Sequence, residues 1–302
     1  MFCGRAIVST STQDQWAQWL LERRHGGDLE RHDSVIDALI PVRDQVLDKA
    51  NPAQGEVLLD VGTGDGLIAF GALPRLGESG RIILSDVSQD LLGQCQSIAQ
   101  ELSVLHQCQF LEASADDLTA IENESVDVVT TRSVLIFVGA KQKAFQEFYR
   151  VLKPGGRLSM FEPINRFGYP APPHMFGVYE GYDVTPVMEI ARKVKDVYGR
   201  IQPPSDPMLD FDERDLLAFA EEANFEEIHV DVKFEIRPLS PQRWEVFKNS
   251  AGNPKVPTLE EAMTQVLMPK EKDVFESHLR PLVESGQGTR RSAASFLWAT
   301  KL

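Results

Sequence analysis

Cysteine is scarce in this chain of 302 residues, which contains only Cys3, Cys95 and Cys108. These cysteines are odd in number, lie far apart and form no C-x-x-C pair. They therefore indicate neither a disulfide framework nor a zinc site. The His, Asp and Glu residues also show no spacing that is typical of a metal-ligand set. We expect reduced thiols and no metal requirement.

Long apolar runs are missing as well. No segment approaches the roughly 18 consecutive apolar residues of a membrane-spanning helix. Residues 1–12 also lack the apolar stretch that defines a secretory signal. We therefore expect a cytoplasmic protein that makes no membrane contact.

Positive charge is in short supply. The 31 Lys and Arg residues face 45 Asp and Glu residues, which gives a formal net charge of -14. Nucleic-acid binding needs cations that neutralise phosphates, so we expect no nucleic-acid partner. The pairs Arg23-Arg24 and Arg290-Arg291 are embedded in mixed sequence, and such pairs are typical of a solvated surface.

Apolar residues, at 42%, are sufficient for the core of one large α/β domain with additions. From residue 56 onward, segments with strand and helix patterns alternate, and no internal repeat is present. The predicted strands are 57–61, 81–87, 108–113, 126–131, 157–162, 227–237 and 292–301, and the helices between them are 67–76, 89–102, 141–152 and 213–223. This alternation predicts an α/β fold with a seven-stranded, mostly parallel sheet and helices on both faces.

Three segments interrupt or precede this pattern. Residues 1–55 are predicted to form an N-terminal helical cap or lid, in which Trp16 and Trp19 share one helical face. The domain at 56–302 carries helical cap insertions at about 165–210 and 238–290. The first insertion is rich in aromatic residues, namely Phe167, Tyr169, Phe176, Tyr179 and Tyr182. These either line a pocket for a flat or apolar small molecule or pack the cap onto the sheet.

The most informative motif is Asp60-Val61-Gly62-Thr63-Gly64-Asp65-Gly66, which follows an apolar strand. Its glycines permit a sharp turn and a close approach of the backbone to a ligand. A dinucleotide motif, G-x-G-x-x-G, would need a third glycine at position 67, where Leu67 stands. A carboxylate at Asp60 would also repel a pyrophosphate. The motif therefore favours a nucleotide-type cofactor that carries an ammonium and a sulfonium.

Two further features accompany this motif in order: Asp86 at the end of the second strand, and Val151-Leu-Lys-Pro-Gly-Gly-Arg157 before the fifth. Over about residues 56–163 the chain thus resembles the class I S-adenosylmethionine-dependent methyltransferases, in particular the small-molecule branch similar to the ubiquinone/menaquinone C-methyltransferases. The resemblance implies a Rossmann-like class I methyltransferase fold, S-adenosyl-L-methionine as cofactor and a small-molecule acceptor that receives a methyl group by in-line displacement. We expect a monomer or a homodimer.

The resemblance also implies a set of cofactor-binding residues. It comprises Asp60, Gly62, Thr63, Gly64, Gly66, Asp86, Val87, Ser114, Ala115, Asp116, Thr131, Arg132 and Ser133. Asp86 is expected to accept both hydroxyls of the ribose, although it could instead cap a helix in competition with Ser88. The adenine contact remains open between Asp116, Asp117, and Ser114 with the backbone of Ala115. Asp65 either contacts the ligand or stabilises the turn.

Candidate catalytic residues are Glu162, His174 and Arg132. Arg132 and Glu162 lie at the carboxyl ends of predicted strands, where ligands bind in open α/β sheets. Arg132 could bind an acidic group of the substrate or pair with Glu162 or Asp127. Should a general base be needed, Glu162, His174 or His25 could serve, although His174 is also typical of a surface loop.

Two rival functions remain. An NAD(P)-linked oxidoreductase is opposed by Asp60 and Leu67 of the motif itself. The other rival is a non-catalytic scaffold that keeps the cofactor fold. The glycines of the motif and Asp86 disfavour this alternative, because a protein that does not catalyse a reaction needs a complete cofactor site less.

Overall fold

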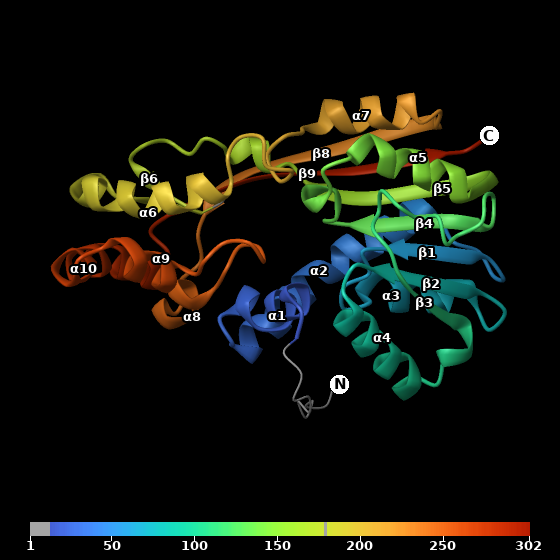
Figure 1. The fold of residues 1–302 in the computed structure, drawn as a ribbon, viewed down its shortest axis with the longest axis horizontal. Coiled ribbons are helices and arrows are strands. Elements are labelled where there is room, and N and C mark those ends of the chain that lie inside the picture. The colour runs from blue at the N-terminus through green and yellow to red at the C-terminus, as the bar shows by residue number, and fades with distance from the viewer. Residues whose placement is uncertain (1–12, 178–179) are drawn as a thin grey trace.

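The computed structural model describes residues 13–177 and 180–302 (Figure 1). Cys3 and Tyr179, named above, lie outside these ranges. Figure 1 shows two parts, a sheet flanked by helices and a lobe built mainly of helices, which are joined by two long strands. Among the described helices, none is long and apolar enough to cross a bilayer.

Seven strands form the main sheet. Their spatial order is β3 (Cys108–Glu112), β2 (Arg81–Asp86), β1 (Val57–Val61), β4 (Val126–Arg132), β5 (Leu152–Pro163), β9 (Thr289–Thr300) and β8 (Glu226–Pro238). The first five are parallel, whereas β9 runs antiparallel to both β5 and β8. All seven correspond to predicted strands, and the mostly parallel α/β sheet is confirmed.

Helices cover both faces of this sheet because successive strand residues point to opposite sides. One face is covered by α2 (Leu29–Ala50), α3 (Leu67–Leu76) and α4 (Gln89–Glu101), and the other by α5 (Lys141–Val151) and α7 (Glu213–Glu222). In β1, the fully buried Leu58 belongs to the core with α2, α3 and α4, whereas its neighbour Leu59 belongs to the core with α5 and α7.

The two insertions, far apart in sequence, pack together into the helical lobe. Its elements are β6 (Met175–Phe176), β7 (Glu180–Asp183), α6 (Met188–Ile201), α8 (Trp244–Asn249), α9 (Leu259–Val266) and α10 (Pro269–Ser285). Tyr182, Trp244 and Phe275 are the largest side chains of its separate core. Tyr182 therefore packs inside the lobe, which matches neither of the two predicted alternatives for the cap aromatics.

The lobe also corrects the predicted number of strands, since the described sheet has nine. β7 pairs with the end of β9, and β6 pairs with β7. The prediction missed these two because segments of two and four residues are too short to show an alternating pattern.

At the N-terminus, α1 (Gln15–Leu21) and the short 3-10 helix η1 (Arg23–His25) precede α2. The carboxylate of Asp14 accepts the N–H groups of Trp16 and Ala17 at the start of α1, and the Ser88 hydroxyl donates to the same carboxylate at 2.6 Å. The N-terminal helix is thereby fixed to the end of β2.

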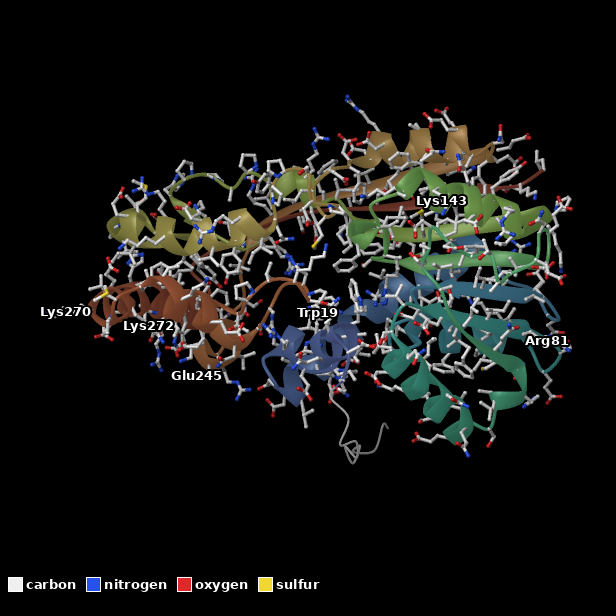
Figure 2. All side chains as sticks on the ribbon, viewed as in Figure 1. Trp19, Arg81, Lys143, Glu245, Lys270 and Lys272 are labelled. Atoms are coloured by element: carbon white, nitrogen blue, oxygen red, sulfur yellow. The ribbon has the colours of Figure 1, made fainter. Side chains whose placement is uncertain are left out.

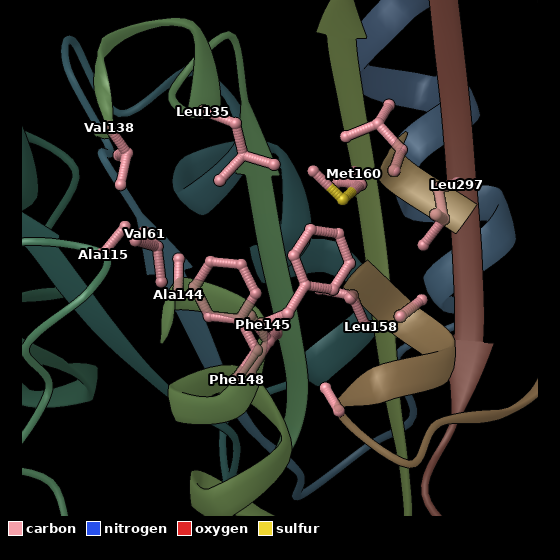
Figure 3. Packing of buried hydrophobic residues seen from close by; sticks show 14 of the residues in the cluster. Val61, Ala115, Leu135, Val138, Ala144, Phe145, Phe148, Leu158, Met160 and Leu297 are labelled. Carbon is pink, nitrogen blue, oxygen red and sulfur yellow. The ribbon is translucent and has the colours of Figure 1, made fainter. Parts of the chain in front are cut away.

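Phe145 on α5 lies at the centre of the larger core (Figure 3) and is fully buried. Its ring contacts those of Phe148, Phe219 and Phe225 at centroid distances of 5.9, 5.9 and 6.5 Å. We expect Phe145→Ala to lower the free energy of unfolding by about 3–5 kcal/mol, because it leaves a cavity that neighbours cannot fill. Urea denaturation followed by circular dichroism measures this change.

The control is Leu217→Ala on α7, where the side chain is 39% exposed. This variant should cost less than about 1 kcal/mol, because little apolar area is lost from the core. Equal losses for the two variants would contradict the assignment of Phe145 to the core.

Candidate active site

The glycine-rich turn joins β1 to α3. Gly62, Gly64 and Gly66 have φ angles of 64°, 56° and 79°, which is a left-handed backbone conformation that residues with a side chain rarely adopt. Space is restricted too, since a Cβ at Gly62 would lie 2.3 Å from Val134 Cγ2. Asp65 accepts the N–H of Leu67 at 3.3 Å, so its carboxylate stabilises the start of α3.

Asp60 lies beneath this turn rather than at its surface. Its carboxylate is 2% exposed and accepts the hydroxyls of Thr63 and Thr130, both at 2.8 Å. Burial raises the pKa of Asp60 to about 6, although the two hydroxyl donors favour the ionised form. Asp60 therefore holds the turn against β4.

Asp86 ends β2 and faces the turn. One carboxylate oxygen accepts the N–H of Gly64 and the other that of Ser88, each at 2.9 Å. The N-cap of α4 is Ser88, whose hydroxyl accepts the N–H of Leu91, so Asp86 is not needed as the cap. Burial also raises the pKa of Asp86 above its ordinary value. Each of its oxygens keeps a second lone pair for a ligand.

A cavity of about 1600 Å³ opens beside the turn. It lies among the carboxyl ends of the strands, the N-terminal helices and the helical lobe. The predicted cofactor residues that line it are Gly62, Gly64, Asp86, Val87, Ser114, Ala115, Asp116, Arg132 and Ser133. Four others, Asp60, Thr63, Gly66 and Thr131, do not line it. The structure thus places most of the predicted cofactor residues on the cavity wall, whereas the other four do not reach the cavity.

The loop that follows β3 carries Ser114 and Asp116, and both residues line the cavity. The Ser114 hydroxyl donates to the carboxylate of Asp116. Asp117 instead accepts the N–H and the hydroxyl of Thr119 on the exposed surface. Asp116 and Ser114 therefore face the cavity and Asp117 does not, which removes one of the three alternatives for this position.

Arg132, at the end of β4, extends into the cavity. No ion pair or hydrogen bond of its guanidinium is found with residues 13–177 or 180–302. The alternative pairing with Asp127 is not observed, because Asp127 pairs with Lys153 at 2.8 Å. Thr131, one residue earlier, is fully buried behind the wall.

Glu162 takes a different place from the predicted one. Its side chain is fully buried outside the cavity wall, and Oε1 accepts the N–H groups of Val134 and Leu135 at 2.9 and 3.0 Å. Burial raises its pKa to about 7, even though these N–H groups and the charge of Arg132 favour the ionised form. Glu162 thus fixes the loop after β4 and does not line the cavity.

The histidines separate in the same way. His174 is exposed and does not line the cavity, so its predicted catalytic role does not fit its position. His25 lies on η1, is 3% exposed and does line the cavity. Burial, together with Arg24, His32 and Arg31, lowers the pKa of His25 to about 4, so its imidazole is neutral at pH 7.

Sequence reasoning missed several residues of the cavity wall. Arg24 and Arg290 were predicted to be solvated, yet both line the cavity, as does Arg31. Trp19, labelled in Figure 2, joins α1 to both parts of the molecule: its indole N–H donates to the carbonyl of Ala251 at 2.9 Å, and its ring contacts Phe137. Across residues 13–177 and 180–302, no group of three or more His, Cys, Asp or Glu side chains could hold a metal ion.

The raised pKa of Glu162 predicts a pH dependence of stability. Between its ordinary pKa of 4.5 and about 7, the folded chain keeps a proton that the unfolded chain has released. The contribution of Glu162 to the free energy of unfolding should therefore fall by about 1–3 kcal/mol as pH rises through this window, while His25, whose pKa is lowered, contributes with the opposite sign below pH 6.5. Glu162→Gln retains an oxygen for Val134 and Leu135 but removes this contribution, so its free energy of unfolding should fall less, or rise more, than that of the wild type between pH 5 and 7.5 in urea denaturation.

Glu189→Gln provides the matched control, because Glu189 lies on the surface of α6 and pairs there with Arg192. Its profile should follow that of the wild type. If Glu162→Gln kept the wild-type slope as well, burial of an uncharged Glu162 would be excluded.

Comparison with known proteins bears on this site. The chain is 31% identical over 157 residues to the ubiquinone/menaquinone biosynthesis C-methyltransferase UbiE of Klebsiella pneumoniae subsp. pneumoniae, which covers 50% of this chain and 60% of the relative. Identity to the UbiE of Escherichia coli O1:K1 is 33% over 118 residues, covering 38% and 46%. The chain thus spans about 60% or less of the length of these two relatives.

Solved structures share the fold. YcgJ from Bacillus subtilis has a TM-score of 0.52 at 17% identity and covers 89% of this chain and 99% of its own. Geranyl diphosphate C-methyltransferase from Streptomyces coelicolor A3(2), solved with Mg²⁺, geranyl diphosphate and S-adenosyl-L-homocysteine, has a TM-score of 0.51 at 15% identity, covering 93% and 88%. The [4+2]-cyclase SpnF has a TM-score of 0.52 at 19% identity, covering 88% and 81%.

A family model gives the assignment. The model described as the ubiE/COQ5 methyltransferase family matches residues 40–231, which include β1 to β5 and the glycine-rich turn. Because this match covers more than half of the chain, the chain belongs to the ubiE/COQ5 methyltransferase family.

Proposed function

We propose that this chain transfers a methyl group from S-adenosyl-L-methionine to a small-molecule acceptor by in-line displacement. The observation that carries the proposal is Asp86, a buried carboxylate at the cavity wall whose two oxygens each keep a free lone pair beside the glycine-rich turn. A ribose presents two hydroxyl donors, which match these two acceptor positions. Family membership supports the same cofactor.

The rest of the wall also fits this cofactor. Gly62 and Gly64 bring bare backbone to the cavity, where no Cβ stands between the chain and a ligand. Val87, beside Asp86, is 46% exposed and offers apolar surface to a flat ring. Ser114, Ala115 and Asp116 close this end, so we assign them to the adenine. When bound, the cofactor supplies a methyl group on a positively charged sulfur.

The cavity has room for a second molecule. A volume of about 1600 Å³ exceeds the roughly 300–1,000 Å³ that a single small-molecule site usually occupies. Its remaining walls carry aromatic rings, including Trp16, Trp19, Phe137, Tyr169 and Phe176. The position of Tyr169 supports the pocket alternative for the cap aromatics, whereas Phe176 both lines the cavity and packs against Phe275 in the lobe core. This surface suits an acceptor with a flat or apolar body.

The residues of this chain act chiefly by alignment. An in-line displacement requires the acceptor atom to lie opposite the departing sulfur at roughly 3–3.5 Å, and fixing that geometry can supply about 7–11 kcal/mol of the barrier. The turn and Asp86 fix one reactant, while the aromatic walls fix the other. Since Glu162 and His174 do not reach the cavity, we assign neither of them a proton-transfer role. Trp16, Trp19 and Leu20 of α1 line the cavity and add apolar surface beside the strand ends.

Isothermal titration with S-adenosyl-L-homocysteine, the product form of the cofactor, tests the proposal. We expect micromolar binding to the wild type. Asp86→Asn should weaken it at least about tenfold, because an amide nitrogen replaces one of the oxygens that accept from the ribose.

Glu112→Gln is the control. Glu112 is the register partner of Asp86 on β3 but is exposed and does not line the cavity, so this variant should bind like the wild type. NADH serves as the competing ligand. Binding of NADH without binding of S-adenosyl-L-homocysteine would favour an oxidoreductase, and binding of neither would favour the scaffold reading.

A further inference from the structure

Cations dominate the cavity wall of a chain whose net charge is -14. Seven Lys and Arg residues line the cavity, compared with three Asp and Glu residues. Two of the acids, Asp86 and Asp116, lie at the end assigned to the nucleoside. The third, Glu235, pairs with Lys233 at 2.9 Å. Most of the cavity therefore has the opposite sign of charge to the chain as a whole.

Three arginines form the densest part of this positive wall. Arg24 comes from η1, Arg31 from the first turns of α2 and Arg132 from the end of β4. They lie close enough to affect one another: burial, the charge of Arg132 and the charge of Arg31 together lower the pKa of Arg24 to about 10, against an opposing effect of Asp65. The N-terminal helices and the end of β4, which are distant in sequence, thus bring like charges to one place.

None of these three side chains forms an ion pair with any of residues 13–177 or 180–302. Arg24 instead lies over the ring of Trp19, with 5.5 Å between the guanidinium carbon and the ring centroid. Other arginines of the chain do find acids, as Arg157 does with Glu56 and Arg75 with Asp48, both at 2.6 Å. Gathering three unpaired guanidinium groups in a partly enclosed cavity costs free energy, which a bound anion would offset.

The cofactor alone does not account for this charge. Its amino-acid end carries one carboxylate beside its own ammonium, and one arginine fork satisfies one carboxylate. Arg132 affects the pKa of Asp60 beneath the turn, and Asp65 in the turn affects the pKa of Arg24, so these two arginines are within electrostatic range of the motif. Arg31 affects the pKa values of Arg24 and His25, and it lies on α2 rather than on an element of the motif.

We propose that the methyl acceptor carries a carboxylate or phosphate group, and that the cluster of Arg24, Arg31 and Arg132 binds this anionic group. This inference rests on the proposed function in one respect, since it takes the bound anion to be part of the methyl acceptor. The binding of an anion by the arginine cluster does not depend on that function. The aromatic walls then hold the body of the molecule while the arginines fix one end. Arg31 is the specificity-determining residue that separates acceptor binding from cofactor binding.

Calorimetric titration with two probes, sodium benzoate and inorganic phosphate, tests this site. Both are titrated at constant ionic strength into protein alone and into protein saturated with S-adenosyl-L-homocysteine. We expect the wild type to bind at least one probe, benzoate if the site takes a carboxylate and phosphate if it takes a phosphate. Arg31→Gln should weaken that binding about tenfold or more and leave the affinity for S-adenosyl-L-homocysteine within twofold of the wild type.

Arg43→Gln is the matched control, because Arg43 lies on the same helix, pairs with Asp44 and does not line the cavity. It should bind both probes like the wild type. Arg132→Gln provides a second variant and should also weaken probe binding, so the result does not depend on one substitution.

The outcomes separate the two proposals. Failure of S-adenosyl-L-homocysteine to bind would overturn the proposed function, while the probe titrations on the free protein would still decide the anion site. Absence of probe binding, or equal weakening by Arg31→Gln and Arg43→Gln, would overturn the anion site. A loss of S-adenosyl-L-homocysteine binding in Arg31→Gln without any change in probe binding would assign the cluster to the cofactor instead.

Discussion

The site depends on the carboxylate of Asp86 more than on any other group. Its two oxygens hold the N–H of Gly64 in the turn after β1 and the N–H of Ser88 at the start of α4. Ser88 in turn donates its hydroxyl to Asp14, which caps α1. One buried acid therefore sets the position of the turn, of a helix behind the sheet and of the helix that covers the strand ends. These hydrogen bonds hold the carboxylate in place at the cavity wall.

A second constraint comes from the long strands β8 and β9, which extend beyond the sheet and carry the helical lobe (Figure 1). The two insertions together build a core around Tyr182, Trp244 and Phe275. The lobe continues from strands of the main sheet, and its residues, among them Tyr198 and Phe247, form part of the cavity wall. The cavity is the space that this arrangement leaves between two cores.

Much of the fold was readable from the sequence, because period-two and helical patterns survive in long elements with one face turned to the core, such as β8 and α5. The sequence did not indicate in which direction the side chains at the ends of the strands point. Asp60 and Glu162 stand in the expected positions of the chain but point into the protein, where threonine hydroxyls and backbone N–H groups surround them. The role of Arg24 depends on Arg31 and Arg132, and no local pattern in the sequence indicates that the N-terminal helices meet the end of β4. Val87 and Ser114, by contrast, reach the cavity directly from the strand ends to which the motifs assigned them.

Trp16 and Trp19 place half of the chain's four tryptophans on the cavity wall. The other two lie elsewhere: Trp244 is buried in the lobe, and Trp298 stacks on His229 at the far end of β9. Indole emission responds to a change in polarity or to a nearby ring, so any molecule that fills the cavity alters the fluorescence of the first pair and leaves the second pair largely as an internal reference. The helix that covers the strand ends thus gives the protein an intrinsic optical signal of occupancy, which needs no attached dye.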